Sequence, residues 1–418
     1  MDSKFYIIKQ NKQTTKINNI QESLDTAIKN SPIDLKVLKG KDVGITVGSR
    51  GIDRIEIILK ELVKLIKKAG GRPHLIPAMG SHGGAEIKGQ LAVLESLKIT
   101  ENNIGAPIIK DIETSIIGRT VNGLKIYCNQ AATTLDHIIV MNRIKPHTDF
   151  TGEIESGLCK MLTIGLGSYN GAEYAHSNAL KIGYEEIITE IARGMMDNLS
   201  LAFGIAIIEN WKNELKAIEI IPENKIIERE KELLEQVKKD KIELPFKKLD
   251  ILIIKEMGKN ISGTGIDTKV IGRIKVDGQK EPETPEIKRI VVLDLTKESH
   301  GNAIGVGLAD IITENTFKKI DLAVTAKNTI TSMAPEQGKI PVIMPDDKTA
   351  ISASIKSLGV NKIDKLKIAC IKNTSNLEKL IISESLLPEV NLNKEIEVID
   401  QIKNLKFNSK GQLLNRLS

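Results

Sequence analysis

The chain has 418 residues, which is enough for two domains with ordinary hydrophobic cores. Aromatic residues make up only 3% of it, and 60 Lys and Arg are nearly balanced by 54 Asp and Glu, for a net charge of +6. Scarce stacking platforms and interleaved charges argue against a nucleic-acid partner, while a small positive balance suits a small anionic substrate.

The cysteines and the apolar runs indicate the cellular setting. The three cysteines, Cys128, Cys159 and Cys370, form no CxxC pair, so neither a zinc ribbon nor a disulfide framework is expected. Residues 1–16 lack the apolar core of a signal peptide, and no apolar run reaches the roughly 18 residues of a membrane helix. We therefore predict a soluble, cytoplasmic protein without a membrane partner.

Strands and helices alternate along the first half of the chain. Apolar positions spaced by three and four residues predict helices, and short runs rich in Ile, Leu and Val predict strands. The expected strands are residues 42–47, 73–79, 136–141 and 201–208, and the expected helices are residues 55–66, 91–97, 184–195 and 228–240. This alternation predicts a parallel sheet with helices on its faces.

The second half repeats the same alternation. Its expected strands are residues 249–254, 289–295, 319–326, 340–345 and 366–371. We predict an α/β fold with two domains, each a mostly parallel sheet flanked by helices, and an active site in the interdomain cleft. The predicted domains are residues 1–245 and 246–389, and the sequence leaves open whether the tail, residues 390–418, packs on the first domain.

Two glycine-rich loops follow strands of the first domain. GSRGI (48–52) places Arg50 where it could grip a carboxylate, or could simply point to solvent from a tight turn. GSHGGA (80–85) places His82 at the next strand end, where a following helix would help it serve as a base. His74 and His137 lie inside strand patterns and are interpreted as sheet residues, and His300 is a second-tier candidate.

The segment from Asn142 to His176 is the richest in reactive side chains. It holds His147, Lys160 and His176 among several glycines, at spacings of thirteen and sixteen residues. Zinc enzymes often carry ligands at i and i+4 on one helix, and this segment has no such pair. The spacing indicates either separate elements that converge on one bulky ligand or the turn residues of a surface excursion.

Four motifs in chain order resemble the nickel-dependent lactate racemase family. They are GSRGI, AMGSHGGA (78–85), NRIKPHTDFTGEIESGLCKMLTIGLG (142–167) and GAEYAH (171–176). Members of that family hold a nickel pincer nucleotide, a pyridinium-3,5-bisthiocarboxylic acid mononucleotide whose carbon and two sulfurs bind the metal. Separate cofactor-synthesis proteins make it, so they are implied as partners, and recombinant protein need not contain the cofactor.

The resemblance also implies a role for each matched residue. Lys160 would tether the nucleotide as a thioamide, and His176 would complete the coordination of the nickel. His82 and His147 would be the paired acid and base, one for each face of the substrate. Arg50 would help to bind the substrate carboxylate.

Two departures from the family concern the substrate. The family usually carries an aspartate three residues before the arginine, where this chain has Val47. It also presents a glutamine and a lysine near a tyrosine in the second domain, and the corresponding loop here, residues 258–273, offers Lys259 for the substrate. We therefore predict a racemase or epimerase that acts on a 2-hydroxy acid other than lactate by hydride transfer.

Two alternative functions would use the same candidate residues in different roles. A zinc- or iron-dependent hydrolase or lyase could use His82, His147 and His176, although it would have no need of Lys160. A non-catalytic anion- or nucleotide-binding protein could use the two glycine-rich strand ends alone. The substrate and the oligomeric state are not indicated by the sequence.

Overall fold

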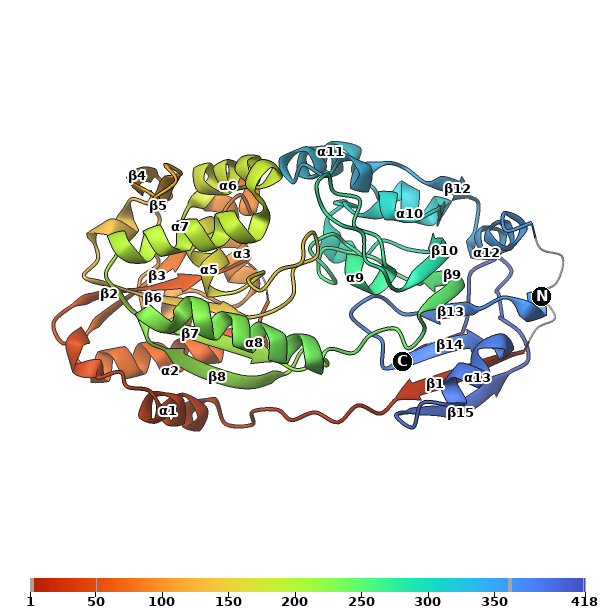
Figure 1. Ribbon diagram of the computed structural model, residues 1–418, viewed down its shortest axis with the longest axis horizontal. Helices are drawn as coiled ribbons and strands as arrows, with labels where there is room; N and C mark the ends of the chain where they lie inside the picture. The colour runs from red at the N-terminus through yellow and green to blue at the C-terminus, as the bar shows by residue number, and fades with distance from the viewer. Residues whose placement is uncertain (1–3, 50, 360–362, 416, 418) are drawn as a thin grey trace. The chain divides into compact units, whose positions relative to one another are not determined.

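The protein consists of two compact units, each with its own sheet (Figure 1). The computed structural model describes residues 4–49, 51–359, 363–415 and 417. We call Thr14–His147 with Thr151–Lys241 the N-terminal unit, and Met1–Gln13 with Thr148–Phe150 and Ile242–Ser418 the C-terminal unit. No helix among the described residues combines the length and the apolarity that crossing a membrane requires.

The N-terminal unit is built on a five-stranded sheet with the order β3-β2-β6-β7-β8. Its strands are β2 (Asp42–Val47), β3 (Arg72–Pro77), β6 (His137–Arg143), β7 (Leu201–Glu209) and β8 (Leu215–Ile221). The first four strands in this order are parallel, and β8 runs antiparallel to β7. The four strands predicted for this half are confirmed, and β8 was not predicted.

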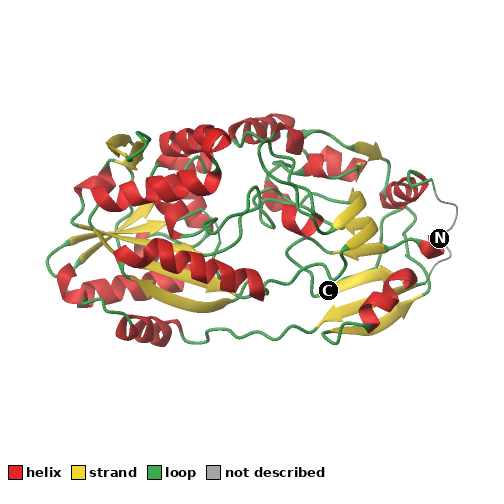
Figure 2. Cartoon of the chain, in the orientation of Figure 1, coloured by secondary structure: helices red, strands yellow, loops and turns green. Residues whose placement is uncertain are grey.

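Helices cover both faces of this sheet (Figure 2). On one face, α1 (Ile20–Asn30) and α2 (Ile55–Lys68) share a core with alternate residues of the strands. On the other face, Gly204 of β7 lies against Leu158 and Ile226, which begin α5 (Leu158–Lys160) and α8 (Ile226–Asp240). Because the sheet is covered on both faces, β2 is buried at every position except Asp42.

The remaining elements of the N-terminal unit connect these layers. They are α3 (Ile87–Ser96), α4 (Glu101–Ile104), the hairpin of β4 (Thr114–Arg119) and β5 (Lys125–Asn129), α6 (Ser168–Ile182) and α7 (Tyr184–Asn198). The predicted helices at 55–66, 91–97, 184–195 and 228–240 are confirmed as α2, α3, α7 and α8, although α3 begins and ends earlier than expected.

The C-terminal unit contains an eight-stranded mixed sheet with the order β12-β11-β10-β9-β13-β14-β1-β15. Its strands are β1 (Phe5–Gln10), β9 (Lys248–Ile254), β10 (Glu286–Val292), β11 (Ile311–Thr313), β12 (Val342–Met344), β13 (Ile368–Ile371), β14 (Lys379–Ser383) and β15 (Ile396–Ile402). Its helices are α9 (Thr268–Ile271), α10 (Glu314–Lys318), α11 (Leu322–Thr331), α12 (Asp347–Lys356) and α13 (Leu387–Asn391). The five strands from β12 to β13 are parallel, and β14, β1 and β15 continue the sheet in antiparallel pairs.

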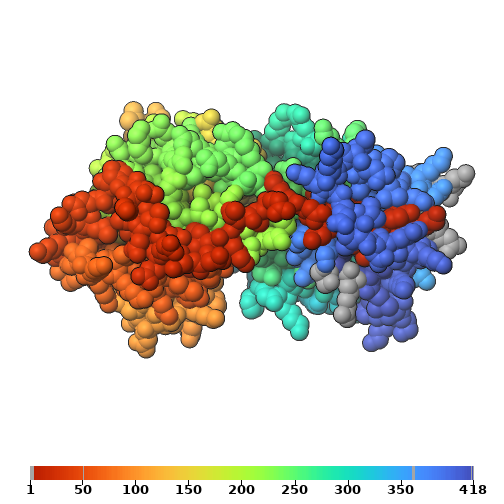
Figure 3. All heavy atoms as spheres, turned by 90° about the horizontal axis from the view of Figure 1, so that it is seen from below, coloured from red at the N-terminus to blue at the C-terminus, as the bar shows by residue number. Residues whose placement is uncertain are grey.

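The division of the chain differs from the predicted domains at both ends. The first thirteen residues belong to the C-terminal unit, where β1 lies between β14 and β15. The tail also belongs there, because β15 pairs with β1 rather than with a strand of the N-terminal unit. Figure 3 shows red atoms of the first residues among blue atoms of the last ones. The predicted boundaries miss this arrangement because β1 pairs with β14 and β15, which are far from it in the sequence, and such long-range antiparallel pairing leaves no local signal.

The strand predicted at residues 319–326 is wrong, because most of this segment forms α11. The Asp321 side chain accepts a hydrogen bond from the Val324 N–H, so it caps the helix. Thr325 and Thr329 are buried on one side of the helix while its apolar residues Leu322 and Ile330 are exposed. The local cap and the i, i+4 spacing of the threonines therefore outweigh the strand preference of the apolar run.

Candidate active site

Three predicted site loops leave the carboxyl ends of neighbouring parallel strands. One loop follows β2, the GSHGGA loop follows β3, and the segment that contains His147 follows β6. Because β2 lies between β3 and β6, all three loops emerge at the same edge of the sheet, where ligands of α/β proteins bind. Arg50, the predicted substrate-binding residue of the first loop, lies outside the described residues.

An irregular helix that carries Lys160 packs against two of these loops. After α5 the chain makes a π-helical turn, Met161–Gly165, before α6 begins. Such turns are frequent at functional sites. A Cβ on Gly48 would lie 3.1 Å from Met161, and a Cβ on Gly80 would lie 3.0 Å from Ile164. The loops after β2 and β3 therefore contact the turn that directly follows Lys160.

Lys160 and His147 are in hydrogen-bond contact. The distance from Lys160 Nζ to His147 Nε2 is 2.5 Å. The backbone N–H of His147 donates to Glu155 Oε2 at 2.5 Å, and the N–H of Gly152 donates to Glu155 Oε1 at 3.2 Å. The carboxylate of Glu155 thus fixes the loop on which His147 lies.

His176 lies on α6 and has a strongly perturbed ring. Burial lowers its pKa to about 4, and the positive charge of Lys160 contributes to the same shift. Its Nδ1 atom is buried and has no hydrogen-bond partner in the described part of the chain. The edge of the ring faces Tyr184, with centroids 5.8 Å apart. His176 is therefore a neutral imidazole at neutral pH with an unused buried nitrogen.

His82 contacts a residue of the neighbouring loop. Ser49 Oγ and His82 Nδ1 form a hydrogen bond, which joins the loop after β2 to the loop after β3. With Nδ1 occupied in this way, proton exchange by the ring is directed to Nε2. Ser49 was not singled out from the sequence, because a serine in a glycine-rich turn carries no signal of the histidine that it will meet.

The structure brings together four of the predicted site residues to different degrees. His147, Lys160 and His176 form one cluster, through the His147–Lys160 contact and through the effect of the Lys160 charge on His176. The loop of His82 is placed at the same turn through Gly80, whose Cβ would also lie 3.4 Å from Ala172 on α6, one helical turn before His176. The roles assigned to these residues stay predictions.

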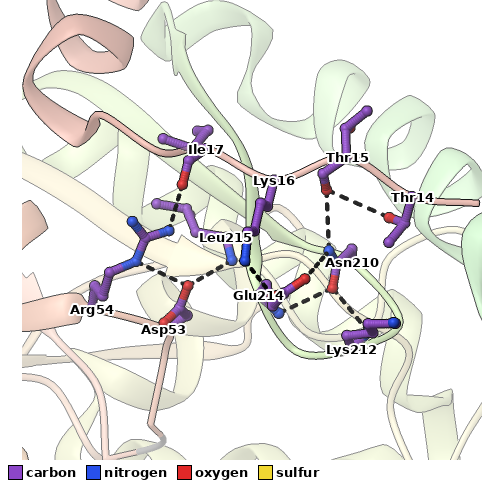
Figure 4. A network of polar contacts seen from close by, with 10 residues as sticks. All are labelled: Thr14, Thr15, Lys16, Ile17, Asp53, Arg54, Asn210, Lys212, Glu214 and Leu215. Carbon is purple, nitrogen blue, oxygen red and sulfur yellow. Dashed lines mark hydrogen bonds and ion pairs between the residues drawn. The ribbon is translucent and has the colours of Figure 1, made fainter.

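The far half of the loop after β2 is held by a polar network (Figure 4). The Asp53 carboxylate accepts from the Leu215 N–H at 2.9 Å, and the Arg54 guanidinium donates to the Ile17 carbonyl at 2.7 Å. The Asp53 N–H in turn donates to Glu209 Oε1 at 2.7 Å. This loop is therefore fixed on its far side to the ends of β7 and β8.

Lys259 and His300 belong to the C-terminal unit. The Lys259 Nζ donates to the Gly263 carbonyl at 2.6 Å and to Asn328 Oδ1 at 3.0 Å. His300 is exposed and ends a short turn with φ of 47°. The substrate-binding role of Lys259, and the interdomain position of the active site, stay predictions.

His74 and His137 lie in the sheet, as interpreted from the sequence. His74 is on β3, with Nε2 3.0 Å from Asp42 Oδ1, and His137 begins β6, with Nδ1 3.0 Å from Ser200 Oγ. Both therefore make local polar contacts at the amino ends of the strands, on the opposite edge from the histidine–lysine cluster.

Two carboxylates near the cluster were also missed by sequence reasoning. Glu155 and Glu230 are both fully buried. Glu155 lies in a loop and shows no pattern, but Glu230 occupies an apolar position of α8 together with Ile226, Leu233 and Leu234. An acidic residue on the apolar face of an amphipathic helix is a signal that could have found it.

The residues of the site can be compared with what the predicted cofactor would need from the protein. Among the described residues, no three His, Cys, Asp or Glu side chains are arranged to hold a metal ion. A pincer nucleotide supplies most ligands of its own metal, so it needs one neutral nitrogen from the protein. His176, with its low pKa and its buried Nδ1 without a partner, fits that requirement.

The comparison with protein families agrees with the motifs. Residues 3–186 match the family model of the lactate racemase N-terminal domain. Among solved structures, the lactate racemase apoprotein from Thermoanaerobacterium thermosaccharolyticum is similar, with 14% identity, a TM-score of 0.47, and coverage of 93% of this chain and 92% of that one. No curated protein matches the chain. The part of the chain at residues 3–186 is therefore a relative of the lactate racemase N-terminal domain.

Proposed function

We propose that the protein is an isomerase that racemises or epimerises a 2-hydroxy acid other than lactate, with a nickel pincer nucleotide as its cofactor. The observation that carries the proposal is the cluster of His147, Lys160 and His176. These three residues are thirteen and sixteen residues apart in the sequence, and they lie close together beside the carboxyl ends of β2, β3 and β6. The matched lactate racemase domain covers Lys160 and all three proposed histidines.

Two residues would hold the cofactor. Lys160 would be the covalent tether through Nζ, and His176 would be the nickel ligand. When bound, the nucleotide would supply an electrophilic carbon that accepts the α-hydrogen of the substrate as hydride and returns it. The neutral state of His176 at neutral pH favours metal binding, because no proton has to be displaced from the ring.

His82 and His147 would handle the proton of the substrate hydroxyl. An imidazole can take this proton near neutral pH, and such general-base help is worth roughly 10²–10⁴ in rate. The planar 2-oxo acid that results can be reduced on either face, so inversion requires one histidine for each face. The Ser49 contact orients His82 through Nδ1, and Glu155 fixes the backbone of His147.

The substrate carboxylate would be bound by cationic side chains. Arg50 would supply a bidentate guanidinium, and Lys259 would supply an ammonium from the loop at residues 258–273. The absence of the family's aspartate at Val47 and the different second-domain loop support a hydroxy acid other than lactate.

A screen of chiral 2-hydroxy acids tests the proposal. Protein made together with the cofactor-synthesis proteins should abolish the optical rotation of one hydroxy acid and should show added mass on the Lys160 peptide. His82→Ala and His147→Ala should each lower kcat at least a hundredfold while the added mass remains.

Each alternative has a distinct result in the same screen. Zinc or iron with an unmodified Lys160 would replace the proposal by a hydrolase or lyase. Ligand binding that is unchanged by both alanine substitutions, with no turnover of any hydroxy acid, would replace it by a non-catalytic anion-binding protein.

A further inference from the structure

Two buried carboxylates lie beside the pair formed by His147 and Lys160. Glu155 and Glu230 are the acidic residues of the described chain that have no exposed surface. Burying a carboxylate is costly unless hydrogen bonds or an opposite charge compensate it. Glu155 lies within the segment that runs from His147 to Lys160, and Glu230 contacts that segment at Cys159, so the burial of both is connected with the geometry of the proposed site.

Glu230 holds the start of the helix that carries Lys160. Its Oε2 accepts a hydrogen bond from the Cys159 N–H at 2.8 Å. The first residue of α5 follows Gly157, which supplies no side-chain cap, so Glu230 takes the place of an N-cap from another helix. A Cβ on Gly157 would lie 2.3 Å from Glu230 Oε1, so the close approach of the carboxylate requires glycine there.

Lys238 holds the loop that carries His147, and it acts through Glu155. Its Nζ lies 2.6 Å from Glu155 Oε1 and donates to the Gly152 carbonyl at 2.7 Å. Glu155 in turn accepts from the His147 N–H at 2.5 Å. Glu230 and Lys238 are eight residues apart on α8, about 12 Å along its axis. One helix therefore anchors both partners of the contact.

We propose that α8 positions His147 against Lys160, with Glu230 and Lys238 as the two positioning residues. The catalytic meaning of this inference rests on the proposed function. α5 continues into the π-helical turn, so only its first turn, with N–H groups that have no partner within the helix, depends on contacts from another element. The fifteen residues of α8 pack on the sheet through Ile226 and so provide a rigid reference for both side chains.

The positioning role of Glu230 is tested by labelling the amine of Lys160 in the cofactor-free full chain. Acetic anhydride modifies accessible lysines, and the rate at Lys160 is read from the mass of its peptide. Glu230→Leu removes the acceptor, and we expect Lys160 to react at least about threefold faster. Leucine leaves the buried Cys159 N–H without its acceptor, so the melting temperature should fall, and the labelling is compared at a temperature where the variant is fully folded.

The conservative variant separates positioning from bulk stability. Glu230→Gln retains an amide oxygen that can accept from the Cys159 N–H, so labelling of Lys160 should stay at the wild-type rate. Burial raises the pKa of Glu230 to about 7, so a neutral side chain is already populated at neutral pH. Unchanged labelling of Lys160 in a folded Glu230→Leu protein would overturn the inference.

The positioning role of Lys238 is tested by measuring how fast His147 is chemically modified. Lys238→Met should increase carbethoxylation of His147 by diethyl pyrocarbonate at least about threefold, because Glu155 loses the cation that holds it. Glu235→Gln, an exposed residue of the same helix paired only with Lys239 among the contacts of the described chain, should change neither label. A wild-type rate at His147 in a folded Lys238→Met protein contradicts the role of Lys238.

The labelling results are independent of the proposed reaction. Neither reagent requires the cofactor or a substrate, so both tests can succeed in a protein that racemises no hydroxy acid. That combination would reject the proposed function and leave α8 as the element that positions the two side chains.

Discussion

The pKa of His176 is lowered from 6.5 to about 4 by two effects. The larger is burial, and the second is the positive charge of the nearby Lys160 ammonium. Between these two pH values the unfolded chain binds a proton at this residue and the folded chain does not. The free energy of unfolding therefore falls as the pH falls from 6.5 to 4, by up to about 3 kcal/mol. This loss is complete near pH 4 and absent above 6.5.

This pH dependence can be measured in the cofactor-free protein by guanidinium unfolding. The fluorescence of Trp211, the one tryptophan of the chain, reports on the N-terminal unit. His176→Gln should flatten the decline between pH 6.5 and 4. Lys160→Gln should reduce it, because the pKa of His176 rises when the positive charge is removed. Lys181→Gln, at an exposed position of the same helix, is the control. Equal slopes in wild type and His176→Gln would contradict the assignment.

At the scale of elements, the contact between the GSHGGA loop and the π-helical turn can be tested with a matched pair of glycines. Gly80 and Gly84 both have positive φ, 58° and 72°, so alanine costs about 1–2 kcal/mol at either position. A Cβ at Gly80 would also press on Ile164, at 3.0 Å, whereas a Cβ at Gly84 meets nothing within 4 Å. Gly80→Ala should therefore destabilise the N-terminal unit more.

The loop contact should also be visible at His82. Gly80→Ala should change the rate at which diethyl pyrocarbonate modifies His82, and Gly84→Ala should leave that rate near wild type. Guanidinium unfolding followed by Trp211 fluorescence gives the stability of each variant. Equal losses of stability in the two variants would mean that the loop does not pack on the turn as described.

The elements that could be predicted from the sequence are those whose signal is local. β2, β3, β6 and β7 are buried at most of their positions, and their apolar residues are visible in the sequence as short runs. β15 is exposed at most of its positions, and its pairing with β1 depends on a segment almost four hundred residues away. The site divides in the same way. His82, His147, Lys160 and His176 were marked by glycines and by a family resemblance, while Ser49, Glu155 and Glu230 are defined only by contacts across the fold.

At the scale of the whole molecule, the chain begins in one unit, builds the other, and then returns. β1 places Phe5 and Ile8 in buried positions of the C-terminal unit, and Phe5 belongs to its core cluster. Without β1, the buried residues Leu380, Ile381 and Ile382 of β14 would lie on an edge strand, and β15 would lose its partner in the sheet. The C-terminal unit therefore depends on a segment that a cut at residue 245 would remove.

This dependence predicts different behaviour for two fragments. Residues 14–241 should fold alone, with a cooperative transition in Trp211 fluorescence, because they contain the complete five-stranded sheet. Residues 242–418 alone should be poorly folded by circular dichroism and prone to aggregate, because an apolar edge strand is exposed. Joining residues 1–13 to residue 242 should restore a cooperative melt. A short linker suffices, since the Gln10 side chain donates to the Glu243 carbonyl at 3.0 Å. If residues 242–418 melt at the same temperature with and without residues 1–13, β1 is not a required strand, and the boundary expected from the sequence describes the folding units better than the sheet does.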